Sequence, residues 1–478
     1  MRVLKFGGTS LADKDAIDRV VSIIKNRTDN EEVIVVISAL NGVTDQLFRL
    51  TSLCYLNDPQ YRSLLNDLKN RHYQLVDNLL TNFEHSKVAE QLEETFRELE
   101  RALTKNLNSH KDFKENQDYI AGFGERLSAP IITSCLRTIG INALYTDTRT
   151  LIKTDSSFGS ATIFESITYK NIKSYFRENS SSVIVATGFI SSTIDDTPTT
   201  LGRGGSDYTA SIFGAAVSAS AIEIWTDVDG LMTADPRKVK AASLISRVSY
   251  ETAKNMSLFG AKVIYPPTIE PAMRFKIPIY IKNTFKPDRP GTIIENKSSI
   301  QNRNQYCISA APKISFLSVQ SEEISRIEKS ILENIFLNDK LGITFFSHTK
   351  TNTEIKFSFS SRDQYLTISE IERLIDSDLS GIIKNYTLLQ NLTMITVVHE
   401  NHSALFHNTI TSYCSRISND KMQALLYDKN SKSLSIFVDK EHELPVLNTL
   451  HKLFSAMIEN GNGIDSSRQN QYNYSAMN

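Results

Sequence analysis

The chain has 478 residues, of which 40% are hydrophobic and 22% are charged, and its formal net charge is −1. This length predicts about three domains, and the balanced charge argues against broad electrostatic attraction to nucleic acid or to a membrane surface. The N-terminus enters a strand-like segment directly and no run of about eighteen apolar residues occurs, so we expect a cytoplasmic protein. The scattered cysteines predict reduced thiols; they are Cys54, Cys135, Cys307 and Cys414.

The first part of the chain, to about residue 290, alternates strand-like and helix-like segments. This alternation predicts an α/β fold, with an open and mainly parallel sheet between two layers of helices. Such a sheet binds its ligands at the carboxyl ends of its strands. The expected strands are 3–6, 33–37, 142–146, 182–186, 221–225 and 277–281, and the expected helical stretches are 11–25, 59–107, 119–138 and 206–219.

After about residue 300, Gly and Pro become scarce and short apolar segments alternate with helical ones. Two rounds of strand and helix predict a pair of small ferredoxin-like α+β modules, and one irregular α+β domain is the alternative. The expected strands are 314–319, 355–359, 392–398 and 434–438, and the expected helices are 324–336, 368–375 and 442–454. The predicted domains are 1–295, 300–385 and 386–458, followed by a tail at 459–478 that its Asn, Ser and Gln content predicts to be disordered.

A phosphate-binding loop is predicted where the first strand ends. Gly7 and Gly8 expose successive backbone N–H groups, the next helix adds the positive end of its dipole, and Lys5 supplies a mobile charge. The spacing is neither that of a Walker loop nor that of a dinucleotide-binding turn. A plain tight turn is the alternative.

Polar groups also follow the second strand and occupy the helix expected over 119–138. Ser38 and Thr44 place two hydroxyls beside the first loop, and helix capping by either is the alternative. Glu125 stands beside Gly122 and Gly124, and a glycine inside a helix costs about 1 kcal/mol relative to Ala. The glycines predict close approach of another group to Glu125, with an ordinary surface glutamate as the alternative.

The strongest motif is a glycine-rich loop that leads into the helix expected over 206–219. Arg203 stands between glycines and brings a planar fork suited to a two-point grip on a carboxylate. The helix start favours anions. A structural loop with Ser206 as the helix N-cap is the alternative.

Two later segments predict contacts to a nucleotide. The strand that ends at Thr226 and Asp227 offers polar groups for a base and ribose, and Arg237 follows as a phosphate ligand. The same segment resembles a fragment of a calcium loop, but the remaining ligand positions are missing. Lys262 follows a glycine at a helix end and is a second candidate phosphate cation, with a solvent-facing lysine as the alternative.

Together these motifs resemble the amino-acid kinase superfamily and, within it, the aspartate kinases. In family order they are Lys-Phe-Gly-Gly-Thr-Ser, Gly-Glu-Arg-Leu-Ser, Thr-Leu-Gly-Arg-Gly-Gly-Ser-Asp-Tyr-Thr-Ala, Trp-Thr-Asp-Val…Asp-Pro-Arg and Phe-Gly-Ala-Lys-Val. They cover the whole first domain. The resemblance implies the amino-acid kinase fold, followed by a pair of ACT regulatory modules that can be interleaved.

The implied reaction transfers the γ-phosphoryl group of MgATP to the side-chain carboxylate of L-aspartate. The product, 4-phospho-L-aspartate, begins lysine, threonine and methionine synthesis. Because the side chain of aspartate, with a pKa near 3.9, is ionised at neutral pH, the nucleophile needs no general base. The protein must instead hold two anions together, which requires lysines, backbone N–H groups and Mg²⁺.

The resemblance also assigns residues to each ligand. Lys5 would steady the transferred phosphoryl group, Arg203 would grip the α-carboxylate of aspartate, and Glu125 would bind its ammonium group. Lys5, Asp207 and Lys262 are the expected catalytic residues, with Asp207 orienting the lysine and the substrate amine, and Mg²⁺ is expected to bind through ATP oxygens with no direct protein ligand. The ATP set is Lys5, Gly7, Gly8, Ser10, Thr226, Asp227, Met232, Arg237 and Lys262, and the aspartate set is Ser38, Thr44, Glu125, Phe189, Arg203, Ser206 and Asp207.

The sequence departs from the family pattern at two places. Many relatives carry an aromatic residue where this chain has Met232, which bears on ATP affinity. Segment 318–336 lacks the glycine-bearing turn by which relatives admit an effector amino acid, and Glu322, Glu323 and Arg326 stand there instead. Feedback by lysine or threonine is therefore open, and the ACT-like modules are expected to support a homodimer or higher homo-oligomer.

Two other functions remain as alternatives at this point. One is a kinase of the same superfamily that acts on another acid, such as glutamate, N-acetylglutamate or a carbamate; Glu125 and Arg203, which suit a free α-amino acid, disfavour it. The other is a catalytically silent sensor that works through its ACT-like half. The lysines and Asp207 weigh against the sensor.

Overall fold

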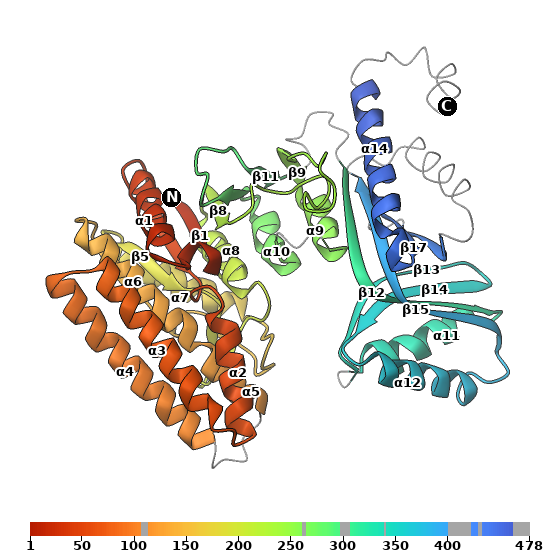
Figure 1. Cartoon of the computed structure of the whole chain (residues 1–478), viewed down its shortest axis with the longest axis horizontal. Helices are drawn as coiled ribbons and strands as arrows, with labels where there is room; N and C mark the ends of the chain where they lie inside the picture. The colour runs from red at the N-terminus through yellow and green to blue at the C-terminus, as the bar shows by residue number, and fades with distance from the viewer. Residues whose placement is uncertain are drawn as a thin grey trace. The chain divides into compact units, whose positions relative to one another are not determined.

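The computed structural model describes residues 1–106, 113–260, 264–296, 306–338, 341–399, 422–428 and 433–461. The chain forms two compact units (Figure 1). Unit 1 comprises Met1–Leu231, Ser246–Tyr250 and Lys262–Ile300, and unit 2 comprises Met232–Ile245, Glu251–Ala261 and Gln301–Asn478.

Unit 1 is built on an eight-stranded sheet with the order β3-β5-β2-β1-β8-β10-β11-β9. Neighbouring strands are parallel except for the pair β10 and β11, so the predicted open, mainly parallel sheet is confirmed. The strands are β1 (Arg2–Phe6), β2 (Val33–Ile37), β3 (Ala143–Thr146), β5 (Val183–Thr187), β8 (Ala221–Thr226), β9 (Arg247–Ser249), β10 (Ile279–Asn283) and β11 (Thr292–Glu295). A second sheet contains β4 (Lys153–Thr154), β6 (Ile190–Thr193) and β7 (Pro198–Thr200).

Helices cover both faces of the large sheet. Side chains alternate along a strand, and Leu4 and Phe6 of β1 join the core formed with α1 (Lys14–Thr28) and α6 (Phe123–Thr138). Lys5 therefore points to the opposite face, which α8 (Gly205–Val217) covers. On that side α8 also packs against α7 (Glu165–Glu178) and α10 (Pro266–Phe275).

A group of helices extends unit 1 between β2 and β3, and α3 and α4 lie side by side within it (Figure 1). The single helix expected over 119–138 is wrong, because α5 ends before Gly122 and α6 begins after it. At Gly122 a Cβ atom would lie only 3.1 Å from Ile190 Cγ2. The helices of this group are α2 (Val43–Tyr55), α3 (Gln60–Leu79), α4 (Asn82–Asn106) and α5 (Phe113–Ala121).

Unit 2 contains a six-stranded antiparallel sheet with the order β13-β14-β12-β15-β17-β16. Its strands are β12 (Tyr306–Ser321), β13 (Ile343–Lys350), β14 (Glu354–Ser361), β15 (Ile383–His399), β16 (Ala424–Asp428) and β17 (Ser433–Val438). Its helices include α11 (Ile324–Ile331), α12 (Gln364–Asp376) and α14 (Glu443–Gly461), and α9 (Tyr250–Leu258) precedes them in the chain.

The long strands β12 and β15 are shared by two ferredoxin-like modules. The first module has the strand order β13-β14-β12-β15 with α11 and α12, and the second has β12-β15-β17-β16 with α14. Residues 306–311 of β12 pair with 394–399 of β15, so the second module takes one strand from residues that precede the first. The pair of modules is confirmed and the single irregular domain is wrong, while the boundaries 300–385 and 386–458 stay predictions.

Some sequence predictions fall where little or nothing is described. Helix α14 continues to Gly461, and the rest of the predicted tail, 462–478, lies outside the described residues, as does Cys414. Cys54, Cys135 and Cys307 are buried free thiols. Within the described ranges, no helix has both the length and the apolar character needed to cross a membrane.

A buried carboxylate ties three parts of unit 1 together at the centre of the large sheet. Glu223 of β8 is only 1% exposed, and it receives Arg2 Nη1 at 2.7 Å and Arg27 Nη2 at 2.8 Å. Trp225 Nε1 donates to it at 3.0 Å. Glu223 therefore links the N-terminal strand, helix α1 and the central strand β8 through charged contacts.

We predict that Glu223→Gln lowers the free energy of unfolding by roughly 2–4 kcal/mol, because two arginines then lose their anionic partner. Urea or guanidinium denaturation monitored by circular dichroism measures this change. The matched control is Lys14→Ala, which breaks the exposed Lys14–Asp18 pair and should change stability little. Equal free energies of unfolding for the two variants would contradict the proposed stabilising role of Glu223.

Candidate active site

A cavity of about 550 Å³ lies in unit 1 at the carboxyl ends of the parallel strands. Phe6 pairs with Ile37 and Trp225, and Ile37 pairs with Thr187, so the loops that follow β1, β2, β5 and β8 leave the sheet at one edge. The predicted site residues that line the cavity are Lys5, Gly8, Ser38, Thr44, Glu125, Phe189, Arg203 and Ser206.

Lys5 is the buried cation of this cavity. Its side chain is 11% exposed, and its Nζ lies 2.6 Å from Asp207 Oδ1 in the first turn of α8. A carboxylate at this end of a helix is favoured by the helix dipole. At Gly7 a Cβ atom would lie 3.4 Å from Lys5 Nζ, and at Gly8 one would lie 3.1 Å from the Ala39 carbonyl oxygen. The two glycines therefore let the loop after β1 pack closely against the lysine and the loop after β2.

Glu125 is enclosed beneath the loop after β2. The residue is 2% exposed, so the alternative of a surface glutamate is wrong. Its Oε1 accepts a hydrogen bond from Ala39 N at 3.1 Å, while its Oε2 has no hydrogen-bond partner among the described residues. Burial raises the pKa of Glu125 to about 8. The group that approaches here is Ala39, since a Cβ at Gly124 would lie 2.7 Å from Ala39 Cβ.

The loop that carries Arg203 is fixed by its glycines. Gly202 and Gly204 have φ values of +74° and +67°, a region that side chains disfavour. A Cβ at Gly202 would lie 2.9 Å from the Gly159 carbonyl oxygen, and one at Gly204 would lie 2.4 Å from Tyr265 Cβ. The loop thus packs too tightly for larger residues and leaves the Arg203 side chain exposed at the cavity.

The helix caps rule out two alternatives raised by the sequence. Helix α8 has Gly204 as its N-cap, and α2 has Gly42, with no side-chain capping bond at either. Capping by Ser206, Ser38 or Thr44 is therefore wrong. The three hydroxyl residues line the cavity instead.

Phe189 occupies an unusual backbone position on the same cavity. Its φ of +67° is rare for an aromatic residue, and such conformations cluster at functional sites. Its N–H donates to Thr209 Oγ1 of α8 at 3.0 Å. A Cβ at Gly205 would lie 2.7 Å from Phe189 Cδ2, so this ring and the start of α8 hold each other in place.

The residues predicted to contact ATP are only partly brought together. Thr226 ends β8 and Asp227 follows it at the same sheet edge, and Thr226 Oγ1 donates to Asp227 Oδ1 at 3.1 Å. Ser10 is fully buried, and its Oγ lies 2.7 Å from Thr284 Oγ1, so its hydroxyl is engaged within the protein. The contacts of these residues with a nucleotide stay predictions.

The other three ATP residues lie outside unit 1 or outside the described residues. Met232 and Arg237 belong to unit 2. The Arg237 side chain is 88% exposed, and its guanidinium pairs with Asp235 at 2.8 Å. Lys262 lies outside the described residues.

The calcium-loop alternative finds no support in the contacts after β8. Asp229 accepts a hydrogen bond from Asn283 Nδ2 at 2.5 Å and pairs with Lys286 Nζ at 3.2 Å. Its carboxylate is thus already bound by protein donors. Among the described residues, no three His, Cys, Asp or Glu side chains gather in a way that could hold a metal ion.

Further residues line the cavity that the sequence analysis gave no role. Four of them sit on helices α2 and α5, outside the quoted motifs, and the fifth, Thr200, ends β7 at the start of the glycine-rich motif. Gln117, Asp118 and Thr200 reach the cavity because α5 packs against β7. A single sequence does not reveal that packing. These residues are Asp45, Phe48, Gln117, Asp118 and Thr200.

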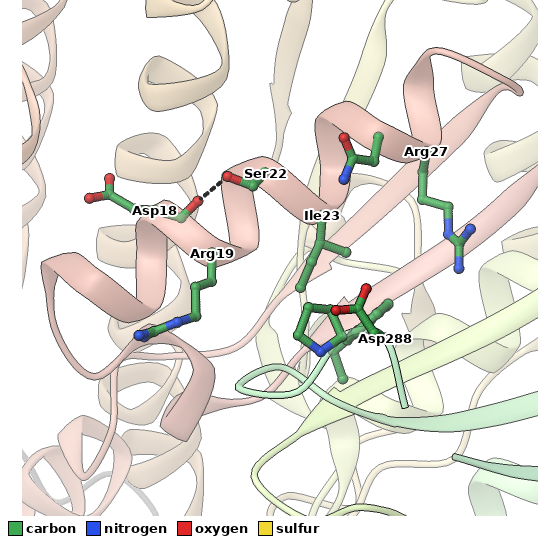
Figure 2. Close-up of a pocket in the computed structure, with 9 residues that line it drawn as sticks. Asp18, Arg19, Ser22, Ile23, Arg27 and Asp288 are labelled. Atoms are coloured by element: carbon green, nitrogen blue, oxygen red, sulfur yellow. Dashed lines mark hydrogen bonds between the residues drawn. The ribbon is translucent and has the colours of Figure 1, made fainter. Parts of the chain in front are cut away.

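A second cavity, of about 400 Å³, lies beside α1 and is lined by none of the predicted site residues that the structure describes (Figure 2). Figure 2 shows Asp18, Arg19, Ser22 and Ile23 along one helix, with Ser22 Oγ donating to the Asp18 carbonyl at 2.8 Å. Arg27 at its end is already paired with Glu223. Two of the charged residues at this cavity are thus paired within the protein, Asp18 with Lys14 and Arg27 with Glu223.

The chain belongs to the amino acid kinase family, whose model matches residues 1–283. The bifunctional aspartokinase/homoserine dehydrogenase of Buchnera aphidicola is 30% identical over 461 residues, which cover 94% of this chain and 56% of that protein. The aspartokinase of Chlamydia pneumoniae is 29% identical over 462 residues, covering 94% of this chain and 96% of that one. The chain spans about half the length of the bifunctional relatives that it matches over nearly its full extent.

The fold matches that of solved aspartate kinases. Escherichia coli aspartokinase III in complex with aspartate and ADP gives a TM-score of 0.79 at 25% identity, with 95% of this chain and 99% of that chain covered. The match extends over both units, which agrees with the amino-acid kinase fold followed by two ACT-type modules.

We predict that Glu125 makes stability depend on pH. Because its pKa is near 4.5 when exposed and about 8 in the folded chain, the folded state holds a proton that the unfolded state loses. This contribution is complete below about pH 4.5 and disappears as the pH rises to about 8. Glu125→Gln should lack it, so the stability difference between wild type and the variant should shrink from pH 5 to pH 8 in denaturation series. A constant difference would contradict the raised pKa.

Proposed function

We propose that this chain is an aspartate kinase, which transfers the γ-phosphoryl group of MgATP to the side-chain carboxylate of L-aspartate. The observation that carries the proposal is the buried Lys5, held 2.6 Å from Asp207 at the cavity that also contains Glu125 and Arg203. In this set Lys5 is a fixed cation for phosphate. The carboxyl group of Glu125 suits the ammonium group of a free amino acid, and the guanidinium of Arg203 suits its carboxylate.

The chemistry needs positioning and charge neutralisation more than proton transfer. The attacking carboxylate is ionised at neutral pH and repels the triphosphate. A cation held by a neighbouring carboxylate in a sheltered site needs little reorganisation as charge develops on the migrating phosphoryl group. Lys5 would stabilise that charge with the backbone N–H group of Gly8, since the Gly7 N–H already donates to the Trp225 carbonyl at 3.1 Å. Asp207 fixes the direction of the Lys5 ammonium group.

The amino-acid end of the substrate suits Arg203 and Glu125. Arg203 would hold the α-carboxylate with its two-point donor geometry. Glu125 is protonated below about pH 8 in the free protein, and a bound ammonium group would favour its ionised form, so binding should release a proton. Ser38, Thr44 and Ser206 would complete the pocket with hydroxyls, and Phe189 with its ring.

The nucleotide would lie near Thr226 and Asp227 at the end of β8. Met232, Arg237 and Lys262 are assigned to it by the family resemblance alone. Mg²⁺ would be held through oxygens of ATP, and it supplies neutralisation of the phosphate charge. This suits an ion that keeps several of its waters and binds few protein carboxylates. Asp207, paired with Lys5, would help to orient the phosphate and its ion.

Similarity along nearly the whole chain to the Chlamydia pneumoniae aspartokinase supports the proposal. The proposal includes a cytoplasmic homo-oligomer whose ACT-type modules can bind an effector amino acid. One relative of the chain is the lysine-sensitive aspartokinase 3 of E. coli, and a solved structure of E. coli aspartokinase III contains lysine and aspartate. In this chain the corresponding turn carries Glu322 and Glu323 in place of the glycine-bearing turn of relatives. The effector is therefore not assigned, and lysine and threonine must both be tried.

We predict that the chain forms an acyl phosphate from aspartate and MgATP, and that Lys5→Ala lowers kcat by about 10²–10³-fold because a transition-state cation is lost. Trapping the product with hydroxylamine as the hydroxamate measures both. Lys14→Ala, which removes an exposed lysine of α1, is the control and should keep full activity. Product from another acid but not from aspartate would contradict the substrate assignment, and an active Lys5→Ala would contradict the role of the lysine.

Two arginine variants should separate the substrate sites. Arg203→Ala should raise KM for aspartate by about 10²-fold and leave KM for MgATP nearly unchanged, because a charged two-point contact is lost. Arg237→Ala should show the opposite pattern if it binds ATP phosphates. Steady-state kinetics with each substrate varied in turn measures both constants. Equal changes in the two constants for either variant would contradict these assignments.

A further inference from the structure

Asp118 of helix α5 is a buried carboxylate on the wall of the cavity. It is 3% exposed and lines the cavity together with Glu125, Thr200 and Arg203. In the part of the chain that the structure describes, Asp118 forms no ion pair; its partners are neutral donors. A buried, unpaired carboxylate is costly unless several hydrogen bonds satisfy it.

Three hydrogen bonds satisfy the Asp118 carboxylate. Its Oδ2 accepts from Gly159 N at 2.9 Å and from Thr200 N at 2.8 Å, while its Oδ1 accepts from Thr200 Oγ1 at 2.8 Å. Burial raises the pKa of Asp118, and these three donors oppose that rise. The carboxylate thus joins the loop around Gly159 to the end of strand β7.

The two segments that Asp118 joins determine where the Arg203 loop begins. Thr200 is the last residue of β7, and its carbonyl accepts from Ala161 N at 2.9 Å. Gly202 packs against Gly159, because a Cβ there would lie 2.9 Å from the Gly159 carbonyl oxygen. Gly202 in turn accepts from Gly205 N at 2.9 Å, which closes the turn around Arg203. A contiguous set of contacts therefore leads from Asp118 to Arg203.

The charge of Asp118 does not explain its presence in this cavity. If the cavity takes an amino-acid carboxylate and a phosphate, a further negative charge on its wall weakens both interactions. The hydrogen-bond geometry does explain it, because one oxygen receives two backbone donors from different segments. We propose that Asp118 is a positioning residue, which holds Gly159 and Thr200 together and so places Arg203 for the substrate α-carboxylate. The catalytic part of this inference rests on the proposed aspartate kinase activity.

The substitution Asp118→Asn separates charge from geometry. The oxygen of the introduced amide would accept both backbone N–H groups, and the amide nitrogen would donate to Thr200 Oγ1, since a hydroxyl also accepts. Asp118→Asn therefore removes the charge and keeps all three contacts. Asp118→Ala removes the charge and the contacts together.

The first measurement is steady-state kinetics of the full chain. Asp118→Ala should raise KM for aspartate by about tenfold or more and change KM for MgATP by less than about threefold, while Asp118→Asn should stay within about threefold of wild type in both. In the double variant, Asp118→Ala should raise KM for aspartate little beyond the value for Arg203→Ala alone. Both substitutions act through the contact between Arg203 and the substrate α-carboxylate. Equal losses in the Ala and Asn variants, no loss in either, or additive losses in the double variant would overturn the proposal.

The second measurement does not depend on activity. Hydrogen exchange measured by mass spectrometry should show faster exchange in peptides covering 155–164 and 198–206 for Asp118→Ala, and wild-type exchange for Asp118→Asn. If wild type makes no acyl phosphate but the exchange pattern is as expected, the proposed function fails and the structural role of Asp118 stands. Unchanged exchange in Asp118→Ala would overturn that role.

Thr200→Val provides the test if Asp118→Ala does not fold. This variant removes the Thr200 hydroxyl donor and leaves both backbone donors in place. It should raise KM for aspartate by about fivefold, less than Asp118→Ala does, and change KM for MgATP by less than about threefold, because one of three hydrogen bonds is lost. A folded Thr200→Val with unchanged kinetics and unchanged exchange over 198–206 would overturn the proposal.

Discussion

The contact between Lys5 and Asp207 is the interaction on which the cavity depends. Strand alternation directs Lys5 to the face that α8 covers, and the first turn of α8 meets it with a carboxylate. The cation is therefore held at the meeting point of a central strand and a helix start, where water is largely excluded. In the proposed reaction, two negatively charged reactants would approach each other there, because the opposing charge is fixed in place before either arrives.

Packing, as much as ligand binding, accounts for the glycines around this cavity. Gly7 and Gly8 make room for Lys5 and for the loop at Ala39, and Gly124 lets α6 approach that same loop. Gly204 lies against Tyr265 within unit 1. These close approaches carry the polar groups from separate strands and helices into one small volume. At Gly124 and Gly204 an added Cβ would lie within 3.0 Å of a neighbour, so these two close approaches require glycine.

The sequence predicted the centre of the large sheet well because strands such as β2, β5 and β8 are apolar runs buried along nearly their whole length. It missed the short strands β9 and β11. It also predicted which loops meet, since parallel strands place their carboxyl ends at one edge. It could not predict Asp118 or Thr200, because their roles arise from hydrogen bonds between segments 82 residues apart. The break at Gly122 was missed because the helical pattern continues through it and Gly122 itself keeps helical backbone angles, with φ of −65° and ψ of −11°.

The strands shared within unit 2 limit how the chain can be divided for study. A fragment starting at residue 386 would lack 306–311, and the β15 backbone that pairs with them would become an open sheet edge. Tyr306 and Ile308 would also leave the core beneath α14. Excised pieces of this half should therefore tend to associate through the bared edge, and a soluble regulatory fragment must begin before β12.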